Sequence, residues 1–198
     1  MADDASVGEL GESVRRTELG DGAWLDLRPR WITGADALFE RLAHGVDWHA
    51  ERRPMYDRVV DVPRLLNFVD EHDPLPDPAL VLAKRALDRH YEHELGEHFA
   101  TAGLCLYRDG RDSVAWHGDR IGRGSTHDTM VAIVVLGSPR ALALRPAGGG
   151  AGRRYELGHG DLVVMGGSCQ RTWEHAVPKT VRPVGPRISV QFRTRGVR

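Results

Sequence analysis

The pattern of apolar and polar positions changes near residue 100. Upstream of that point, residues 34–44 and 79–95 carry apolar side chains at the spacing of an amphipathic helix. Downstream, apolar residues occur in short runs separated by turns rich in glycine and proline. The pattern therefore predicts two helices and, after them, a series of short strands.

The expected strands are numerous and short. Before residue 70 they cover residues 23–27 and a hairpin within 48–66, while residues 1–22 are expected to form a loose tail or a first hairpin. After residue 100 they cover residues 104–107, 114–117, 129–136, 141–144, 154–157, 161–165, 172–175 and 187–193. Such a series is typical of a sandwich, barrel or jelly roll. The expected fold class is α+β and mainly β: a double-stranded β-helix (jelly roll) with two flanking helices.

The composition is that of one globular domain. The chain has 198 residues, 41% hydrophobic and 28% charged, which is ordinary for a folded unit with its own core. The longest apolar run, residues 131–136, is far shorter than the ~20 residues that cross a bilayer. Residues 1–16 lack the apolar segment of a secretory signal. Cys105 and Cys169 make no disulfide framework, so we expect a cytoplasmic protein without a membrane partner.

Charge is unevenly distributed along the chain. Residues 1–119 contain 14 Lys/Arg and 24 Asp/Glu, whereas residues 120–198 contain 13 Lys/Arg and 4 Asp/Glu. Two interpretations stay open. Either the two parts pair with each other within one fold, or the basic part faces a polyanion such as nucleic acid.

Three residues have the character of a metal site. His117 and Asp119 are two positions apart, so on an extended strand both side chains point to one face. His175, at the end of an expected strand, lies 56 residues beyond Asp119 and can supply a third ligand. Two histidines and one carboxylate occupy one face of an octahedron and leave three positions open, which suits non-haem iron(II). Zinc sites more often use additional His or Cys ligands in a tetrahedron.

A second signal lies in the last expected strand, residues 187–193, because it alternates strictly. Ile188, Val190 and Phe192 are expected on the packed side, and Arg187, Ser189, Gln191 and Arg193 on the other. Arg187 and Arg193 lie ~20 Å apart at ~3.3 Å per residue, so they serve different ends of a pocket. An inward-facing arginine is costly unless it meets an anion, and the dicarboxylate 2-oxoglutarate would satisfy one of them. The alternative is a solvent-exposed edge strand.

Together these segments resemble the AlkB-type 2-oxoglutarate/iron(II) dioxygenases. The similarity covers roughly residues 50–195 and is carried by the order H-x-D, then H, then R-x5-R, with the residues that flank them. The segments are residues 104–110 (LCLYRDG), 113–119 (SVAWHGD), 160–167 (GDLVVMGG), 173–179 (WEHAVPK) and 187–193 (RISVQFR).

The resemblance implies a ligand set and two co-substrates. Iron(II) would be held by His117, Asp119 and His175, and O2 and 2-oxoglutarate would be the co-substrates. Arg187 would grip the distal carboxylate of 2-oxoglutarate with help from the Tyr107 hydroxyl, and Arg193 would lie beside the cofactor and the substrate base. The expected cofactor-binding residues are Tyr107, Arg187, Ser189 and Arg193.

The resemblance also implies a division of the single catalytic domain, residues 1–198. After the tail at about residues 1–22, residues 45–70 would form a lid that holds a flipped nucleotide, and residues 102–195 the jelly-roll core. The candidate substrate contacts are Trp48, Met55, Tyr56, Arg64 and Trp116. For Trp48, Met55 and Tyr56, ordinary core or hairpin packing is the alternative.

Two departures from the family pattern concern the cofactor and the substrate. Asn-x-Tyr is usual in the family where this chain has Cys105-Leu106-Tyr107, so one cofactor hydrogen bond is missing or replaced. Relatives that repair alkylated bases commonly place an acidic residue after the H-x-D, whereas Arg120 and Ile121 follow it here.

The expected activity is oxidative removal of N-alkyl groups from bases in DNA or RNA, with release of succinate, carbon dioxide and formaldehyde. Nucleic acid is the expected partner and a monomer the expected state. Two alternatives stay open: the same oxygenase chemistry on a small molecule or protein, and a weakly active homologue that binds nucleic acid.

Two other constellations carry less weight. Residues 93–98 (HELGEH) nearly match the zinc-protease motif H-E-x-x-H. However, the two histidines are five positions apart, which rotates the second by roughly 140° from the first. Cys169 lies near His175 in sequence but has no residue to orient a catalytic base, so a buried structural cysteine is expected.

Overall fold

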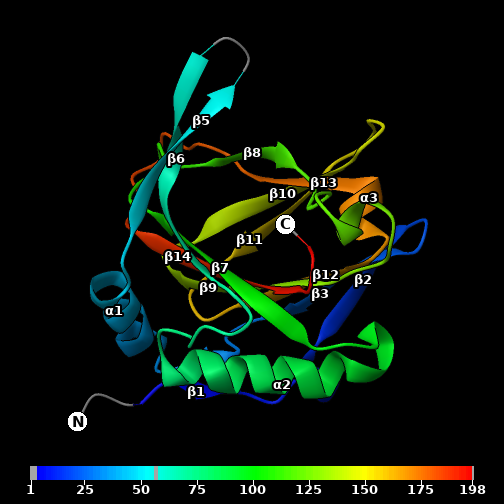
Figure 1. Cartoon of the computed structure of the whole chain (residues 1–198), viewed down its shortest axis with the longest axis horizontal. Coiled ribbons are helices and arrows are strands. Elements are labelled where there is room, and N and C mark those ends of the chain that lie inside the picture. Colours follow the sequence, from blue (N-terminus) through cyan, green and yellow to red (C-terminus); the bar gives the residue numbers. More distant parts are fainter. Residues whose placement is uncertain (1–3, 56–57, 198) are drawn as a thin grey trace.

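A computed structural model describes residues 4–55 and 58–197 and contains two main antiparallel sheets with helices outside them (Figure 1). The strands are β1 (Ser6–Val7), β2 (Arg15–Gly20), β3 (Ala23–Arg28), β4 (Ile32–Thr33), β5 (His49–Met55), β6 (Arg58–Val69), β7 (Phe99–Tyr107), β8 (Val114–His117), β9 (Val131–Gly137), β10 (Arg140–Pro146), β11 (Arg153–Leu157), β12 (Leu162–Gly167), β13 (Trp173–Val177) and β14 (Arg187–Thr194). The larger sheet has the order β2-β3-β12-β9-β14-β7-β6-β5 and the smaller β11-β10-β13-β8, while β1 pairs with β4. This is the mainly β, two-sheet architecture that the sequence predicts.

The helices are α1 (Ala35–Gly45), α2 (Pro78–Leu95) and the short α3 (Cys169–Thr172), which the sequence did not predict. Helix α2 begins where its sequence dictates: the Asp77 side chain accepts a hydrogen bond from the Ala79 amide at 2.8 Å, and Pro78 fills the first turn. It ends at Gly96, which adopts a left-handed conformation. None of the helices in the described part of the chain is long and apolar enough to cross a membrane.

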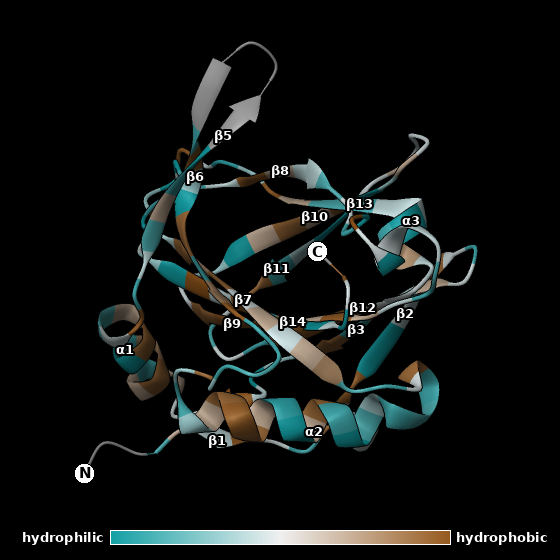
Figure 2. Cartoon of the chain, in the orientation of Figure 1, coloured by the Kyte–Doolittle hydropathy of each residue, from teal (hydrophilic) through white to brown (hydrophobic). Residues whose placement is uncertain are grey.

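Strand β9 lies between two apolar layers. Val131, Ile133 and Val135 face the interior between the two sheets, together with residues of β10 and β12. The alternate residues Ala132, Val134 and Leu136 belong to the layer that packs against α1 and α2. Every side chain from Val131 to Leu136 is therefore buried, as the uninterrupted apolar run predicts. In Figure 2, by contrast, α2 carries both hydrophobic and hydrophilic segments, as expected for a helix that covers a sheet from outside.

The N-terminal segment differs from the loose tail expected over residues 1–22. Residues 15–20 form β2, which pairs with β3 across a turn where Gly20, Asp21 and Gly22 have positive φ. The hairpin alternative is therefore correct for these residues. Within the hairpin, Leu19 is buried in the core. The β5–β6 hairpin, the expected lid, extends the other edge of the same sheet (Figure 1). The large sheet is thus not confined to residues 102–195.

The uneven charge along the chain is partly balanced within the fold. Arg123 pairs with Glu97 at 2.7 Å, and Arg195 pairs with Glu71. Both pairs join a basic residue of the C-terminal part to an acidic residue of the N-terminal part. They support the first of the two interpretations of the charge asymmetry.

Candidate metal and co-substrate site

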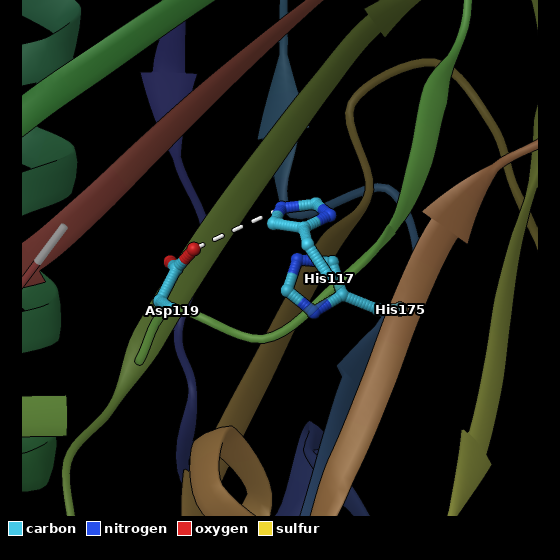
Figure 3. A group of neighbouring side chains, drawn as sticks. All are labelled: His117, Asp119 and His175. Carbon is cyan, nitrogen blue, oxygen red and sulfur yellow. Dashed lines mark ion pairs between the residues drawn. The ribbon is translucent and has the colours of Figure 1, made fainter. Parts of the chain in front are cut away.

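Three side chains with metal-binding atoms meet inside the smaller sheet. His117 ends β8, Asp119 follows in the loop, and His175 lies on β13 directly opposite His117 in the strand register. Their nearest ligand atoms all lie within 4.8 Å of one another. Figure 3 shows the three side chains converging, with a dashed line between His117 Nε2 and Asp119 Oδ1, which lie 3.8 Å apart. Among the described residues this is the only such group of three.

The surroundings of the two histidines favour metal binding. Nδ1 of His117 lies 2.9 Å from the carbonyl oxygen of Ala115. Because a carbonyl only accepts, Nδ1 carries the proton and Nε2 keeps a free lone pair. Burial, together with the neighbouring His117, lowers the pKa of His175 to about 3. Its imidazole is therefore neutral, the form that binds a metal.

Asp119 is held by two residues that leave one carboxylate oxygen for the ligand position. Arg193 on β14 donates from Nε to Oδ2 at 2.7 Å, and the Gln170 side chain accepts from the Asp119 amide at 3.1 Å. Burial by itself raises the pKa of Asp119, but Arg193 and His175 outweigh it and leave the pKa below its ordinary value. The carboxylate is thus ionised, and Oδ1 faces His117.

A cavity extends from this group along the inner face of β14. Its lining combines the two histidines with polar residues of β7 and β14 and a few apolar ones: Arg64, Cys105, Tyr107, Val114, His117, Ile133, Leu142, Leu157, His175, Val177, Arg187, Ser189, Gln191 and Arg193. The strict alternation predicted for β14 is confirmed, because Ile188, Val190 and Phe192 are fully buried on the opposite side.

Arg187 is the unusual member of this lining. Its side chain is 2% exposed, yet Nε and Nη1 have no hydrogen-bond partner in the described part of the chain. Its guanidinium lies 4.9 Å from the centre of the Tyr107 ring. Burial lowers the pKa of Arg187 and raises that of Tyr107, so near neutral pH the arginine remains charged and the phenol protonated. A buried cation with free donors calls for an anion, and a carboxylate fits it.

The residues expected to contact the substrate lie in different surroundings, and only one of those that the structure describes lines the cavity. Arg64, on β6, lines the cavity and donates from Nη1 to the Ser113 carbonyl at 3.1 Å. Trp48 packs against the core, and its indole nitrogen donates to the Ala43 carbonyl of α1, which is the core-packing alternative. Trp116 is 39% exposed beneath the Arg145 guanidinium and is not part of the cavity lining. Tyr56 and the side chain of Met55 lie outside the described residues.

Two residues that support the site were not identified from the sequence. Gln170, on α3, is buried and holds the Asp119 amide. Arg140 is 4% exposed and donates to the carbonyls of Asp109, Asp112 and Pro178, so it ties together segments at the Arg187 end of the cavity. A single arginine directly before the expected strand 141–144 was the available signal, but its partners are distant in sequence.

Comparison with known proteins agrees with this geometry. The profile of the 2OG-Fe(II) oxygenase superfamily matches residues 37–193. The human alpha-ketoglutarate-dependent dioxygenase alkB homolog 3 is 30% identical over 182 residues, which cover 82% of this chain and 62% of that protein. The Arabidopsis thaliana DNA oxidative demethylase ALKBH2 is 33% identical over 135 residues, which cover 56% of this chain and 42% of that protein. The chain thus spans only about 60% of the length of the alkB homolog 3 proteins that it resembles.

Solved structures share the fold. The structure of OsALKBH1 matches with a TM-score of 0.62 at 14% identity, covering 90% of this chain and 100% of the other. A Pseudomonas putida prolyl-4-hydroxylase matches with a TM-score of 0.57 at 20% identity, covering 87% and 93%. The jelly-roll architecture and the AlkB-type resemblance that the sequence predicts are both confirmed. With a matching profile over most of its length and this fold, the chain belongs to the 2OG-Fe(II) oxygenase superfamily.

Proposed function

We propose that this protein is an iron(II)- and 2-oxoglutarate-dependent dioxygenase that removes N-alkyl groups from bases in nucleic acid by oxidation. The observation that carries the chemistry is the convergence of His117, Asp119 and His175, because both histidines line the same cavity as Arg187, whose Nε and Nη1 have no partner among the described residues. The similarity to the Arabidopsis thaliana DNA oxidative demethylase ALKBH2 over 56% of the chain supports the choice of substrate class.

The donor set fits iron(II). Two imidazoles and one ionised carboxylate supply three ligands and leave other positions open for an oxo acid and dioxygen. Arg193 holds the carboxylate of Asp119, and the Ala115 carbonyl sets the tautomer of His117. Both contacts keep the ligands oriented before a metal binds.

The remaining polar lining fits 2-oxoglutarate. Arg187 would bind the distal carboxylate through Nε and Nη1, the atoms without partners, and the protonated Tyr107 hydroxyl would donate a further hydrogen bond. Ser189, 2% exposed on the same face of β14, would add a hydroxyl. Arg193, at the other end of the row, would act on the metal ligand Asp119.

With these groups bound, the chemistry supplied is hydroxylation of a substrate C–H bond, coupled to conversion of 2-oxoglutarate into succinate and carbon dioxide. The protein positions the substrate and excludes water. Arg64 projects into the cavity from the β5–β6 hairpin, so it would contact a base or phosphate held under that hairpin. A hydroxylated N-methyl group then leaves as formaldehyde.

We also infer the remaining features expected from the sequence: a single catalytic domain over residues 1–198, with a lid at 45–70, acting as a monomer in the cytoplasm. Size-exclusion chromatography with light scattering tests the oligomeric state. A dimeric mass would contradict it.

The direct test is anaerobic reconstitution with iron(II), followed by addition of oxygen, 2-oxoglutarate and N-methylated single- or double-stranded oligonucleotides. The expected result is stoichiometric succinate and formaldehyde with one class of oligonucleotide. His117→Ala should abolish both products, whereas His93→Ala, at an exposed position on α2, should leave them unchanged.

Two outcomes would contradict the proposal. Full activity of His117→Ala would refute the metal assignment. Succinate release that no methylated oligonucleotide stimulates would refute nucleic acid as the substrate and would favour the same chemistry on a small molecule or protein. Binding to oligonucleotides should also weaken as salt rises, because phosphate contacts release counterions.

A further inference from the structure

The side chain of Gln191 is fixed in the middle of the cavity by contacts that no part of the reaction explains. It lies on β14 between Ser189 and Arg193, facing inward. Its Nε2 donates to Ser189 Oγ at 2.5 Å and to the Ser189 carbonyl at 3.3 Å, and its Oε1 accepts from Cys105 Sγ at 3.7 Å. The carboxamide therefore bridges β14 and β7.

These contacts allow only one orientation of the carboxamide. The Ser189 carbonyl is acceptor-only, so the atom that faces it must be the amide nitrogen. The amide oxygen then faces the Cys105 thiol, which can donate to it. Gly103, opposite Gln191 in the β7–β14 register, leaves room, since a Cβ there would come within 3.1 Å of Oε1.

The fixed carboxamide determines what Ser189 can do. A serine hydroxyl has one proton, and because Gln191 donates to Oγ, that proton is not used between the two residues. It is left free for an acceptor in the cavity, where Arg187 lies two residues away on the same face of β14. An acceptor at position 191 would instead take this proton.

We propose that Gln191, held by Cys105, is a positioning residue that keeps the Ser189 hydroxyl available as a donor to the distal carboxylate of the dicarboxylate co-substrate. The inference rests on the proposed function. It assigns a role to Cys105, which stands where the family usually has asparagine: its thiol secures a carboxamide that comes from the neighbouring strand instead. The pair thereby contributes to the choice of a dicarboxylate over an oxo acid with one carboxylate.

The test measures binding rather than turnover. The protein is loaded with Mn(II), and dissociation constants for 2-oxoglutarate and for 2-oxobutyrate, which lacks the distal carboxylate, are measured by calorimetry. Gln191→Glu puts an acceptor at position 191 and should weaken 2-oxoglutarate binding roughly tenfold, as expected for losing one hydrogen bond to a charged group. Binding of 2-oxobutyrate should change by less than about twofold, because it lacks the affected contact.

Double variants separate this role from a general disturbance. Ser189→Ala should cause the same selective loss as Gln191→Glu, and combining the two should add nothing further. Cys105→Val should weaken 2-oxoglutarate binding selectively, and Cys105→Ser, which keeps a donor, should restore it. Unfolding temperatures of all variants establish that they fold.

Three results would overturn the inference. One is an unchanged ratio of the two dissociation constants in Gln191→Glu, and another is multiplicative loss in the double variant with Ser189→Ala. Absence of 2-oxoglutarate binding by the unaltered Mn(II)-loaded protein would refute the proposed function itself, and this inference with it. Normal binding with unresponsive variants would refute the inference alone.

Discussion

Arg187 and Arg140 are two buried arginines for which the structure predicts opposite effects of the same substitution. Arg187 is 2% exposed and has two guanidinium nitrogens without partners, whereas Arg140 is 4% exposed and donates to three backbone carbonyls. Replacing each with methionine removes a similar volume of side chain. We expect Arg187→Met to stabilise the ligand-free protein and Arg140→Met to destabilise it.

The magnitudes follow from the contacts. Each buried donor without a partner costs about 1–3 kcal/mol. Against the removal of two such donors stands the loss of the Arg187 contact with the Tyr107 ring, which contributes about 0.5–2 kcal/mol. With about 1.5 kcal/mol for each of the two donors and about 1–2 kcal/mol for the ring contact, Arg187→Met should raise the free energy of unfolding by about 1–2 kcal/mol, or the unfolding temperature by roughly 2–8 °C. Arg140→Met leaves three carbonyls unpaired and should lower stability by about 3 kcal/mol or more.

The assay is thermal unfolding followed by circular dichroism, with and without 2-oxoglutarate on the Mn(II)-loaded protein. At 100 times its dissociation constant, a ligand adds about 2.7 kcal/mol to stability. This shift should occur in the unaltered protein and be lost in Arg187→Met. A ligand-free Arg187→Met that unfolds at a lower temperature than the unaltered protein would refute the argument that this cation is unsatisfied. An undiminished shift with 2-oxoglutarate would refute its role as the anion-binding residue.

Three further predictions concern other parts of the fold. In Gly124→Ala, the added Cβ would overlap the carbonyl oxygen of the proposed metal ligand Asp119. Mn(II) affinity, measured by electron paramagnetic resonance, should therefore fall at least ~10-fold, and an unaltered affinity would contradict this. Burial raises the pKa of Cys169 to about 12, so its thiol stays protonated at pH 8. Mass spectrometry should find this thiol alkylated by iodoacetamide only after unfolding, and rapid labelling of the native protein would contradict this. Tyr91→Phe removes the hydroxyl that donates to the buried Asp26 at 2.9 Å, so urea unfolding should give a loss of about 1–3 kcal/mol, and an unchanged midpoint would contradict it.

Much of the fold could be predicted from the local pattern, because the apolar positions of each strand indicate which of its faces are buried. Residues 131–136 are apolar at every position, and β9 is buried on both faces. Residues 187–193 alternate, and β14 has one packed face and one face toward the cavity. The N-terminal hairpin was harder to predict. Strand β2, which pairs with β3, is mostly exposed, and its sequence therefore shows little apolar periodicity.

The metal group illustrates the limit of local patterns. His117 and Asp119 are close in sequence, but β8 ends at His117 and Asp119 lies in the loop beyond it, so strand alternation does not position the pair. His175 joins them because β13 and β8 are neighbours in the smaller sheet. Which strands become neighbours in a sheet, when they are distant in sequence, depends on the topology of the whole chain, and no local pattern encodes that topology.

The sequence by itself determined the class of fold, the family and the chemical character of the site, because residue types, their order and the period of burial are local properties. Only the tertiary structure decided which buried polar groups pair with or hydrogen-bond to one another. It pairs Arg193 with Asp119, leaves Nε and Nη1 of Arg187 without partners among the described residues, packs Trp48 against the core and sets Gln191 between Cys105 and Ser189. The physical reason is that the state of a buried polar group depends on neighbours that strand register brings together from distant parts of the chain.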